Sequence, residues 1–186
     1  AIDQVSLDME TARRNCLQYL PTDTALFLAT PEDKELLRLQ RKHFRPLLRW
    51  LRKSYGVDLN TSSDMSGRIS HSTQAIRRVQ LIVNQLDPFT LTALQSWTMD
   101  CKSLVIALAL LAGETNVSTA RLAARLEEES QVAVWGVVEG GHDMDRLNLA
   151  VGLSSAQTFM LLLWDADEMK EMLSTWAKII AIDSNI

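Results

Sequence analysis

Residues 87–113 read D-P-F-T-L-T-A-L-Q-S-W-T-M-D-C-K-S-L-V-I-A-L-A-L-L-A-G and hold the most apolar helical pattern in the chain. Asp87 and Pro88 are typical of a helix start, because a carboxylate accepts hydrogen bonds from free amides and proline suits the first helical position. Gly113 is typical of a helix end. The pattern predicts one central helix over about residues 88–112. Its wide apolar stripe consists of Leu91, Leu94, Trp97, Cys101, Leu104, Val105, Leu108 and Leu111.

Helical patterns also fill most of the remaining sequence. They cover residues 6–20, 31–55, 70–86, 117–135, 143–163 and 165–180. The chain holds only 7 Gly and 4 Pro in 186 residues, which is too few for the many turns of an all-β sandwich. We therefore predict an all-α fold, an irregular helical bundle of roughly seven or eight helices around the central apolar helix. We expect residues 1–186 to form a single helical domain, with residues 165–186 as a C-terminal helical extension.

Bulk properties narrow the class of protein. The net charge of −4 weighs against a binder of nucleic acid or of a membrane surface. The longest apolar run, Leu104 to Ala112, is too short to cross a bilayer, so we expect no membrane insertion. Cys16 and Cys101 lack metal or redox spacing and are interpreted as free thiols in a reducing compartment. The chain shows no signal peptide and starts at Ala1, so a targeting segment could have been removed or omitted.

The second pattern, over residues 31–55, carries a strongly basic face. Between Leu36 and Val57 it has no acid, and its cations are Arg38, Arg41, Lys42, Arg45, Arg49, Arg52 and Lys53. Two interpretations stay open: a solvated helix face, or a docking surface for an acidic partner or nucleic acid. Pro46 lies inside the pattern and removes a backbone donor, which predicts a kink or a split of the helix near Phe44.

Residues 121–143 read R-L-A-A-R-L-E-E-E-S-Q-V-A-V-W-G-V-V-E-G-G-H-D. The first half is typical of an amphipathic helix, which Trp135-Gly136 would end. Three glutamates at positions 127–129 would then lie late in this helix, where the macrodipole disfavours negative charge. Such a sequence suggests that the carboxylates act on something outside the helix.

Helical spacing explains two of these glutamates. Arg125 can pair with Glu128 and Glu129, which lie three and four residues further along a helix, and Arg121 can also reach Glu128. Glu127 is different, because it borders the apolar stripe at Leu126. We expect Glu127 to meet a basic group of a partner across a half-dry interface.

Signatures of catalysis are mostly missing. The chain has no G-x-S-x-G, no glycine-rich phosphate loop after a strand and no H-E-x-x-H, and its three histidines stand alone. Glu139 and His142 have the spacing of the Glu-x-x-His motif of carboxylate-bridged metal sites, but two glycines separate them and no second copy exists. The alternative to a binding protein is a small metal-dependent or acid–base enzyme using Glu127, Glu139 and His142. Otherwise His142-Asp143 starts a helix whose free amides Asp143 caps.

Taken together, these residues resemble the mitochondrial ATP synthase assembly factor 2 family. The family pattern L-E-E-E-x-Q, W-G-x-x-E and H-D corresponds to Leu126–Gln131, Trp135-Gly136, Glu139 and His142-Asp143. Further agreement in order and spacing comes from Thr22-Asp23-Thr24, Gln40, Pro46, Trp50, Tyr55-Gly56, Lys102-Ser103, Val105 and Leu108. The resemblance covers about residues 15–163. Departures from the family pattern are Phe44-Arg45 for Trp-Asp, Ser130 for an aromatic residue and Gly140-Gly141 for bulkier residues.

The resemblance implies an assembly chaperone of the mitochondrial matrix and not an enzyme. Its partner would be the free α subunit of the ATP synthase catalytic sector, whose β-facing surface it shields until the hexamer assembles. Family members also carry an N-terminal β-rich domain without counterpart in these 186 residues, so we expect the helical C-terminal domain. No cofactor, metal, nucleic acid or small-molecule substrate is expected. The expected partner-binding residues are Glu127, Glu128, Glu129, Gln131, Trp135, Gly136, Glu139, His142 and Asp143.

Overall fold

The computed structural model of the protein describes residues 2–64, 67–136 and 141–183. In this part of the chain the structure has nine α-helices and no strand, which confirms the predicted all-α bundle. The helices are α1 (Ile2–Leu17), α2 (Lys34–Tyr55), α3 (Thr73–Asn84), α4 (Pro88–Cys101), α5 (Leu104–Leu111), α6 (Val117–Ala124), α7 (Leu126–Trp135), α8 (Gly141–Leu163) and α9 (Ala166–Asp183). Two short 3-10 turns, η1 (Leu20–Thr22) and η2 (Thr24–Leu26), follow α1.

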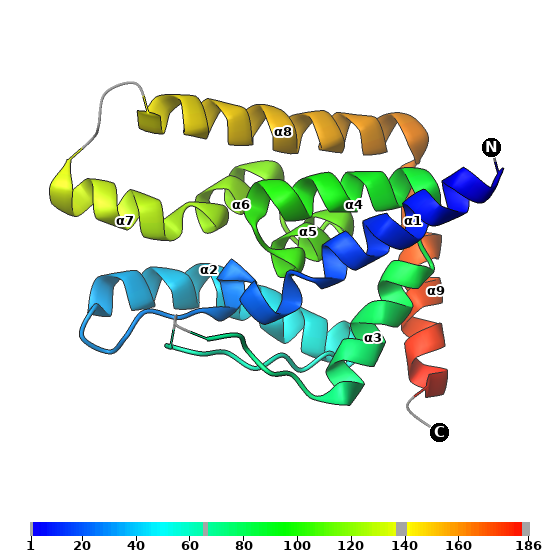
Figure 1. The fold of residues 1–186 in the computed structure, drawn as a ribbon, viewed down its shortest axis with the longest axis horizontal. Coiled ribbons are helices and arrows are strands. Elements are labelled where there is room, and N and C mark those ends of the chain that lie inside the picture. Colours follow the sequence, from blue (N-terminus) through cyan, green and yellow to red (C-terminus); the bar gives the residue numbers. More distant parts are fainter. Residues whose placement is uncertain (1, 65–66, 137–140, 184–186) are drawn as a thin grey trace.

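The helices surround α4 and α5, which together occupy the centre (Figure 1). Helix α8 runs along one long edge of the molecule and packs on α4 and α6. Helix α2 lies on the opposite side and contacts α5, α6, α7 and α9, while α1 packs on α3 and α4. All eight residues of α5 are buried, because an all-apolar helix is stable only when it is covered on every side. The expected apolar centre is therefore present.

One polar contact and one small residue fix α8 on α4. The buried Trp97 indole N–H of α4 donates to the Leu153 carbonyl of α8 at 3.1 Å. One residue earlier, Gly152 lies so close to the carboxylate of Asp100 that a Cβ there would displace it. The hydrogen bond from Trp97 to the Leu153 carbonyl fixes how far α8 can slide along α4.

The predicted single central helix is wrong in one respect, because the chain breaks it between α4 and α5. Lys102 adopts a left-handed conformation (φ 52°) and ends α4, and Ser103 then caps α5 through its hydroxyl. A second cap comes from far away in sequence. The fully buried Asp23 accepts hydrogen bonds from the amides of Ala25 and Val105, both at 3.0 Å. These contacts hold the start of α5 on the η2 turn.

The predicted helix over residues 117–135 is also two helices. Arg125 leaves helical geometry (φ −114°, ψ 11°), which ends α6 and starts α7. The three glutamates therefore lie in the first turn of α7, where the macrodipole favours negative charge. The expectation of an unfavourable position at a helix end is thus wrong. The two breaks, at Lys102 and Arg125, account for nine helices in place of the seven predicted patterns.

Two further expectations concern α2 and the membrane. Helix α2 continues through Pro46, so the predicted split near Phe44 does not occur. Gly56 caps its end in a left-handed conformation, which glycine adopts without a steric cost. In the described part of the chain no single helix has the length and hydropathy to cross a membrane. Residues 143–163 and 167–175, bent by 97°, meet that criterion only as a pair and only by length and composition.

Candidate functional site

Glu127 lies at the rim of a small cavity where α2, α6 and α7 meet. The cavity has a volume of about 220 Å³. Phe44 of α2 and Leu126 of α7 supply apolar walls, and Gln131 lies one turn after Glu127 on α7. Because the helix break places Leu126 inward, its neighbour Glu127 comes to the border between the core and solvent. Glu127 thus lies beside apolar side chains, as predicted for this residue.

A buried amide of α2 holds the carboxylate of Glu127. Gln40 is fully buried, and its Nε2 donates to Glu127 Oε1 at 3.1 Å and to the Phe27 carbonyl at 3.3 Å. Its Oε1 accepts from the Ala29 amide at 2.6 Å. With the oxygen and one N–H fixed by backbone groups, the remaining N–H of Gln40 must point to Glu127. The carboxylate is therefore oriented by the fold.

The environment of Glu127 opposes its charge. Burial raises the pKa of this carboxyl, and the hydrogen bond from Gln40 partly counteracts that effect. Across the described residues no arginine or lysine forms a recorded ion pair with Glu127. A half-buried carboxylate without a cation gains more from an incoming basic group than an exposed one does, because its hydration is already incomplete.

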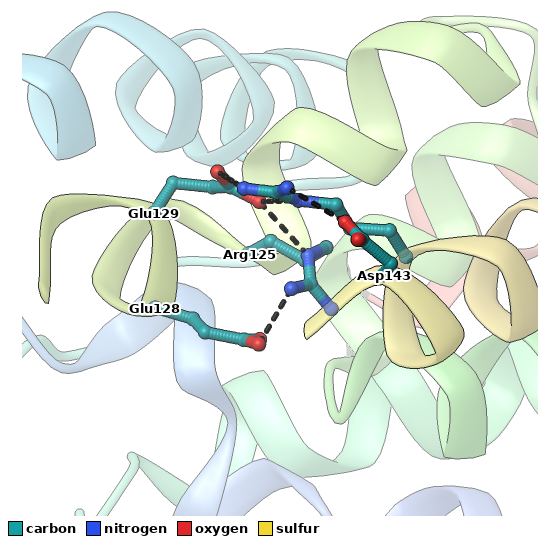
Figure 2. Close-up of polar contacts among 5 residues, drawn as sticks. Arg125, Glu128, Glu129 and Asp143 are labelled. Atoms are coloured by element: carbon teal, nitrogen blue, oxygen red, sulfur yellow. Dashed lines mark hydrogen bonds and ion pairs between the residues drawn. The ribbon is translucent and has the colours of Figure 1, made fainter. Parts of the chain in front are cut away.

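Glu128 and Glu129 are engaged inside the chain instead (Figure 2). The buried Arg125 donates from Nη2 to Glu128 at 2.5 Å and from Nε to Glu129 at 3.1 Å. Arg146 of α8 donates from Nη2 and Nε to the two oxygens of Glu129, at 2.6 and 2.9 Å. These contacts confirm the two predicted pairs with Arg125 and add a bidentate bridge from α8 to α7.

Asp143 completes this network at the edge of the molecule. It lies in the first turn of α8, is exposed, and contacts Arg146 Nη1 at 3.4 Å. The hydrogen bonds from Arg146, and after them those from Arg125, lower the pKa of Glu129 to about 2. Asp143 and Glu129 thus bind the same guanidinium group: Glu129 joins it to α7, and Asp143 holds it from within α8.

The far end of α7 exposes apolar side chains. Trp135 is 79% exposed and Val134 is 72% exposed, and the exposed Gly136 ends the helix with φ 87°. Gln131 is also exposed and lies between this end and Glu127. Two adjacent exposed apolar side chains offer a candidate contact area for a partner. Helix α7 therefore presents a carboxylate at its start and an apolar tip at its end.

Two predicted site residues cannot be placed. Glu139 and the side chain of His142 lie outside the described residues, so the structure neither joins them to Glu127 nor separates them from it. Among the side chains that are described, no group of three His, Cys, Asp or Glu residues is arranged to hold a metal ion.

A comparison with curated proteins agrees with the motifs. No protein-family model matches the chain. The mitochondrial protein atp12 of Schizosaccharomyces pombe is 26% identical over 153 residues, which is 80% of this chain and 53% of the relative. The chain thus spans about half the length of this curated relative. The similarity reaches well beyond the acidic stretch and includes most of the helical bundle.

Solved bacterial structures share the fold. Atp12 of Paracoccus denitrificans has a TM-score of 0.76 at 24% identity, over 87% of this chain and 68% of that chain. The resemblance to the mitochondrial ATP synthase assembly factor 2 family, the family of Atp12, is confirmed. A protein of Agrobacterium tumefaciens described as a candidate chaperone also shares the fold of this chain, with a TM-score of 0.72 at 24% identity over 86% of this chain and 59% of its own.

Two residues of this candidate site were not predicted as part of it. Gln40 has a sequence signal, because it interrupts the apolar stripe of Leu37, Phe44, Leu47 and Leu51 on α2. A lone amide at an inward position predicts a buried hydrogen-bonding group. Arg146 has no such signal. Its partner Glu129 lies 17 residues earlier, and only the packing of α8 along α6 brings the two together.

Proposed function

We propose that this protein is an assembly chaperone that binds the free α subunit of the mitochondrial ATP synthase catalytic sector. It shields the β-facing surface of that subunit until the hexamer assembles, and it acts in the mitochondrial matrix. The similarity to atp12 of Schizosaccharomyces pombe, a mitochondrial protein by name, carries this proposal. The helical bundle common to the chain and Atp12 of Paracoccus denitrificans is consistent with it.

Helix α7 supplies the contact surface in this proposal. Glu127 is held by Gln40, is half-buried and has a raised pKa, so a basic side chain of the α subunit would stabilise its charged form. Trp135 would cover apolar surface of the client, since large aromatic residues dominate interface energetics. A surface that combines one oriented carboxylate with an exposed aromatic side chain suits a temporary complex. The β subunit could later displace the chaperone from the α subunit.

The contributions of the remaining residues differ. Gln131 on α7 and Gly136 at the end of that helix would complete the contact area. Glu128, Glu129 and Asp143 act indirectly: Glu128 pairs with Arg125 at the start of α7, Glu129 joins α7 to Arg146 of α8, and Asp143 holds that arginine from within α8. This division predicts that substitutions of Glu128 or Glu129 reduce chaperone activity mainly through the position of α7. Glu127 is the residue whose charge the client itself would sense.

The decisive experiment is co-expression of the protein with a tagged α subunit, followed by pull-down and a measurement of soluble α. The Glu127→Lys variant should fold normally, as judged by circular dichroism, yet fail to keep α soluble. The matched control is Glu171→Lys, which makes the same charge change at an exposed position of α9. Glu127→Gln, which keeps an oxygen for Gln40 but removes the charge, should bind α with intermediate strength. If Glu127→Lys retains α as well as the control does, Glu127 is not the contact.

A further inference from the structure

A second cavity is lined by residues of α1 and α3 and of the segments that follow α1 and precede α3. Figure 1 shows these two helices towards the end of the molecule away from α7. The cavity volume of about 720 Å³ is more than three times the roughly 220 Å³ beside Glu127. The size falls in the range of sites that enclose a small ligand or a short peptide segment. None of the residues assigned to the α7 surface takes part in it.

The floor of this groove is apolar. Leu20 and Ile69 are buried at its base, and Leu17 of α1 and Ile76 of α3 are half-buried along its walls. The backbone contact from the Ile69 amide to the Pro21 carbonyl, at 2.8 Å, closes the groove at one side. Half-buried leucine and isoleucine walls offer apolar area that an occupant can remove from water.

The rim of the groove is basic. Arg13, Arg14 and Arg68 line it, and Glu10 is the one acidic residue of the lining. Among the described residues none of the three arginines has a recorded ion pair with a carboxylate. This excess of positive charge stands out in a chain whose net charge is −4.

The hydrogen bonds within the chain do not use all the guanidinium N–H donors of these arginines. Arg13 reaches across the groove from Nη2 to the Asn84 carbonyl at 3.4 Å, but its Nε is buried and has no partner. Arg14 makes a side-chain contact to Thr11 within its own helix at 3.3 Å. The terminal guanidinium nitrogens of the rim, and not the covered Nε of Arg13, are the donors that an acidic ligand would pair with.

His71 adds no charge to this rim. Its Nδ1 accepts the Asn60 amide at 3.2 Å, so the proton sits on Nε2, which faces the Leu20 carbonyl at 2.9 Å. Both ring nitrogens are thus used in a neutral tautomer. The charge of the groove therefore comes from three arginines against Glu10.

We propose that this groove binds a partner-protein segment that carries carboxylates beside apolar side chains. Leucine-like side chains would lie on the floor between α1 and α3, and the carboxylates would pair with Arg13, Arg14 and Arg68. The neutral amides of Gln18 and Gln80 on the two walls accept or donate to the segment's backbone. The groove is independent of the α7 surface, so the protein has two binding surfaces of opposite charge preference.

The test uses the full 186-residue chain and fluorescein-labelled helical peptides at low salt. The first peptide places leucines on one face and glutamates on the other. Two matched peptides replace all glutamates by lysine, or all leucines by serine. Fluorescence anisotropy should show binding of the leucine–glutamate peptide, weakening as salt is added, and much weaker binding of both matched peptides.

Variants locate the site. The Arg14→Glu, Arg68→Glu double variant should bind the leucine–glutamate peptide at least about tenfold more weakly, because both substitutions reverse exposed charges on the rim. The control is Arg45→Glu, Arg49→Glu, the same charge change on the exposed face of α2. Glu127→Lys should bind the peptide as the unmodified protein does, which separates this groove from the α7 surface. Equal loss in groove and control variants would show non-specific attraction and overturn the proposal.

Two variants of Gln80 test the proposal at a position where substitution should not unfold the protein. Gln80 is exposed on the α3 wall, so Gln80→Lys should strengthen binding of the leucine–glutamate peptide and Gln80→Glu should weaken it. Circular dichroism should give the same helix content for both. No binding of this peptide, or no difference between the two Gln80 variants, also overturns the proposal.

Discussion

Lys102 stands at the junction of α4 and α5 in a conformation that favours glycine. Its φ of 52° is the one positive value of a non-glycine residue among the described residues. A side chain in this region costs roughly 1–2 kcal/mol, because Cβ approaches the following carbonyl oxygen. The Thr24 amide holds the Lys102 carbonyl at 3.2 Å, so the chain keeps the conformation despite its cost.

Replacing Lys102 by glycine should therefore stabilise the protein. We expect the free energy of unfolding to rise by about 0.5–1 kcal/mol, since glycine adopts positive φ freely but loses more entropy on folding. Urea unfolding followed by circular dichroism measures this change. Lys102→Ala is the control, because it removes the ammonium group but keeps Cβ. A gain of the same size in the alanine variant would contradict the role of the backbone conformation.

Glu129 joins Arg125 and Arg146, and its removal should lower stability at neutral pH. We expect Glu129→Gln to reduce the free energy of unfolding by about 1–2 kcal/mol, a value that allows for solvent screening at a site about one-third exposed. The cost arises because the buried Arg125 loses one of its two carboxylate partners. Urea unfolding at neutral pH gives the difference between the two proteins.

The difference in free energy of unfolding between the unmodified protein and Glu129→Gln should decrease as the pH falls. The pKa of Glu129 is about 2 in the folded protein, below its ordinary value of 4.5, so the folded state binds the proton more weakly than the unfolded chain does. Its contribution is complete above about pH 4.5 and is lost as the pH falls towards 2. The effect of Glu129→Gln should therefore shrink between these values. Asp167→Asn, at an exposed pair on α9, serves as control and should change stability little.

At the scale of elements, Asp23 connects η2 to α5. It is fully buried and caps both elements, and burial raises its pKa to about 6 against the effect of its hydrogen bonds. Asp23→Ala should lower the free energy of unfolding by about 2–4 kcal/mol, because two buried amides lose their acceptor. Thermal unfolding measures the loss. Asp33→Ala removes the exposed cap of α2 and should cost only about 1 kcal/mol. An equal cost at both positions would contradict the importance of the long-range cap.

Helix existence was predictable from the sequence, whereas the helix breaks were not. The apolar stripes and the caps at Asp87 and Gly56 are local signals that predict where helices occur. Beside the breaks at Lys102 and Arg125 lie long-range contacts that only packing supplies. Asp23 reaches Val105 across 82 positions, and Arg146 reaches Glu129 across 17. Periodicity within one segment contains no information on such contacts.

For the whole molecule, α9 is an integral part of the bundle. It packs on α2 and α3, and its partly buried apolar side chains are Met169, Met172, Leu173 and Ala177. The preceding Trp164 indole donates to the buried Thr90 of α4 at 3.1 Å. The description of residues 165–186 as an extension fits the sequence resemblance but understates these contacts. The single-domain assignment itself stays a prediction.

Removal of residues 165–186 should therefore destabilise the bundle. We expect a loss of about 3–5 kcal/mol, from roughly 1 kcal/mol for each apolar side chain that α9 buries. The newly exposed faces of α2 and α3 should also make the shortened protein associate. Differential scanning calorimetry and size-exclusion chromatography measure the two effects. Met172→Ala with Leu173→Ala should give an intermediate loss, and an unchanged unfolding temperature of the shortened chain would contradict this packing.

The candidate site was predictable only in outline. The border position of Glu127 follows from its neighbour Leu126, and the pairs of Arg125 follow from helical spacing. The cavity does not follow, because Phe44 of α2 and the break after α6 form it jointly. For Gln40 the inward position can be predicted from the apolar stripe of α2. Its partner Glu127 cannot be predicted in this way, because it lies 87 residues away.

Three successive glutamates at positions 127–129 suggest a strongly negative patch. In the folded protein the guanidinium groups of Arg125 and Arg146 neutralise two of them, Glu128 and Glu129. An approaching molecule meets the electric field of roughly one uncompensated carboxylate on this turn of α7. Its attraction should then be short-ranged and depend on docking geometry more than on total charge. A partner with a single well-placed cation is therefore favoured over a generally basic one.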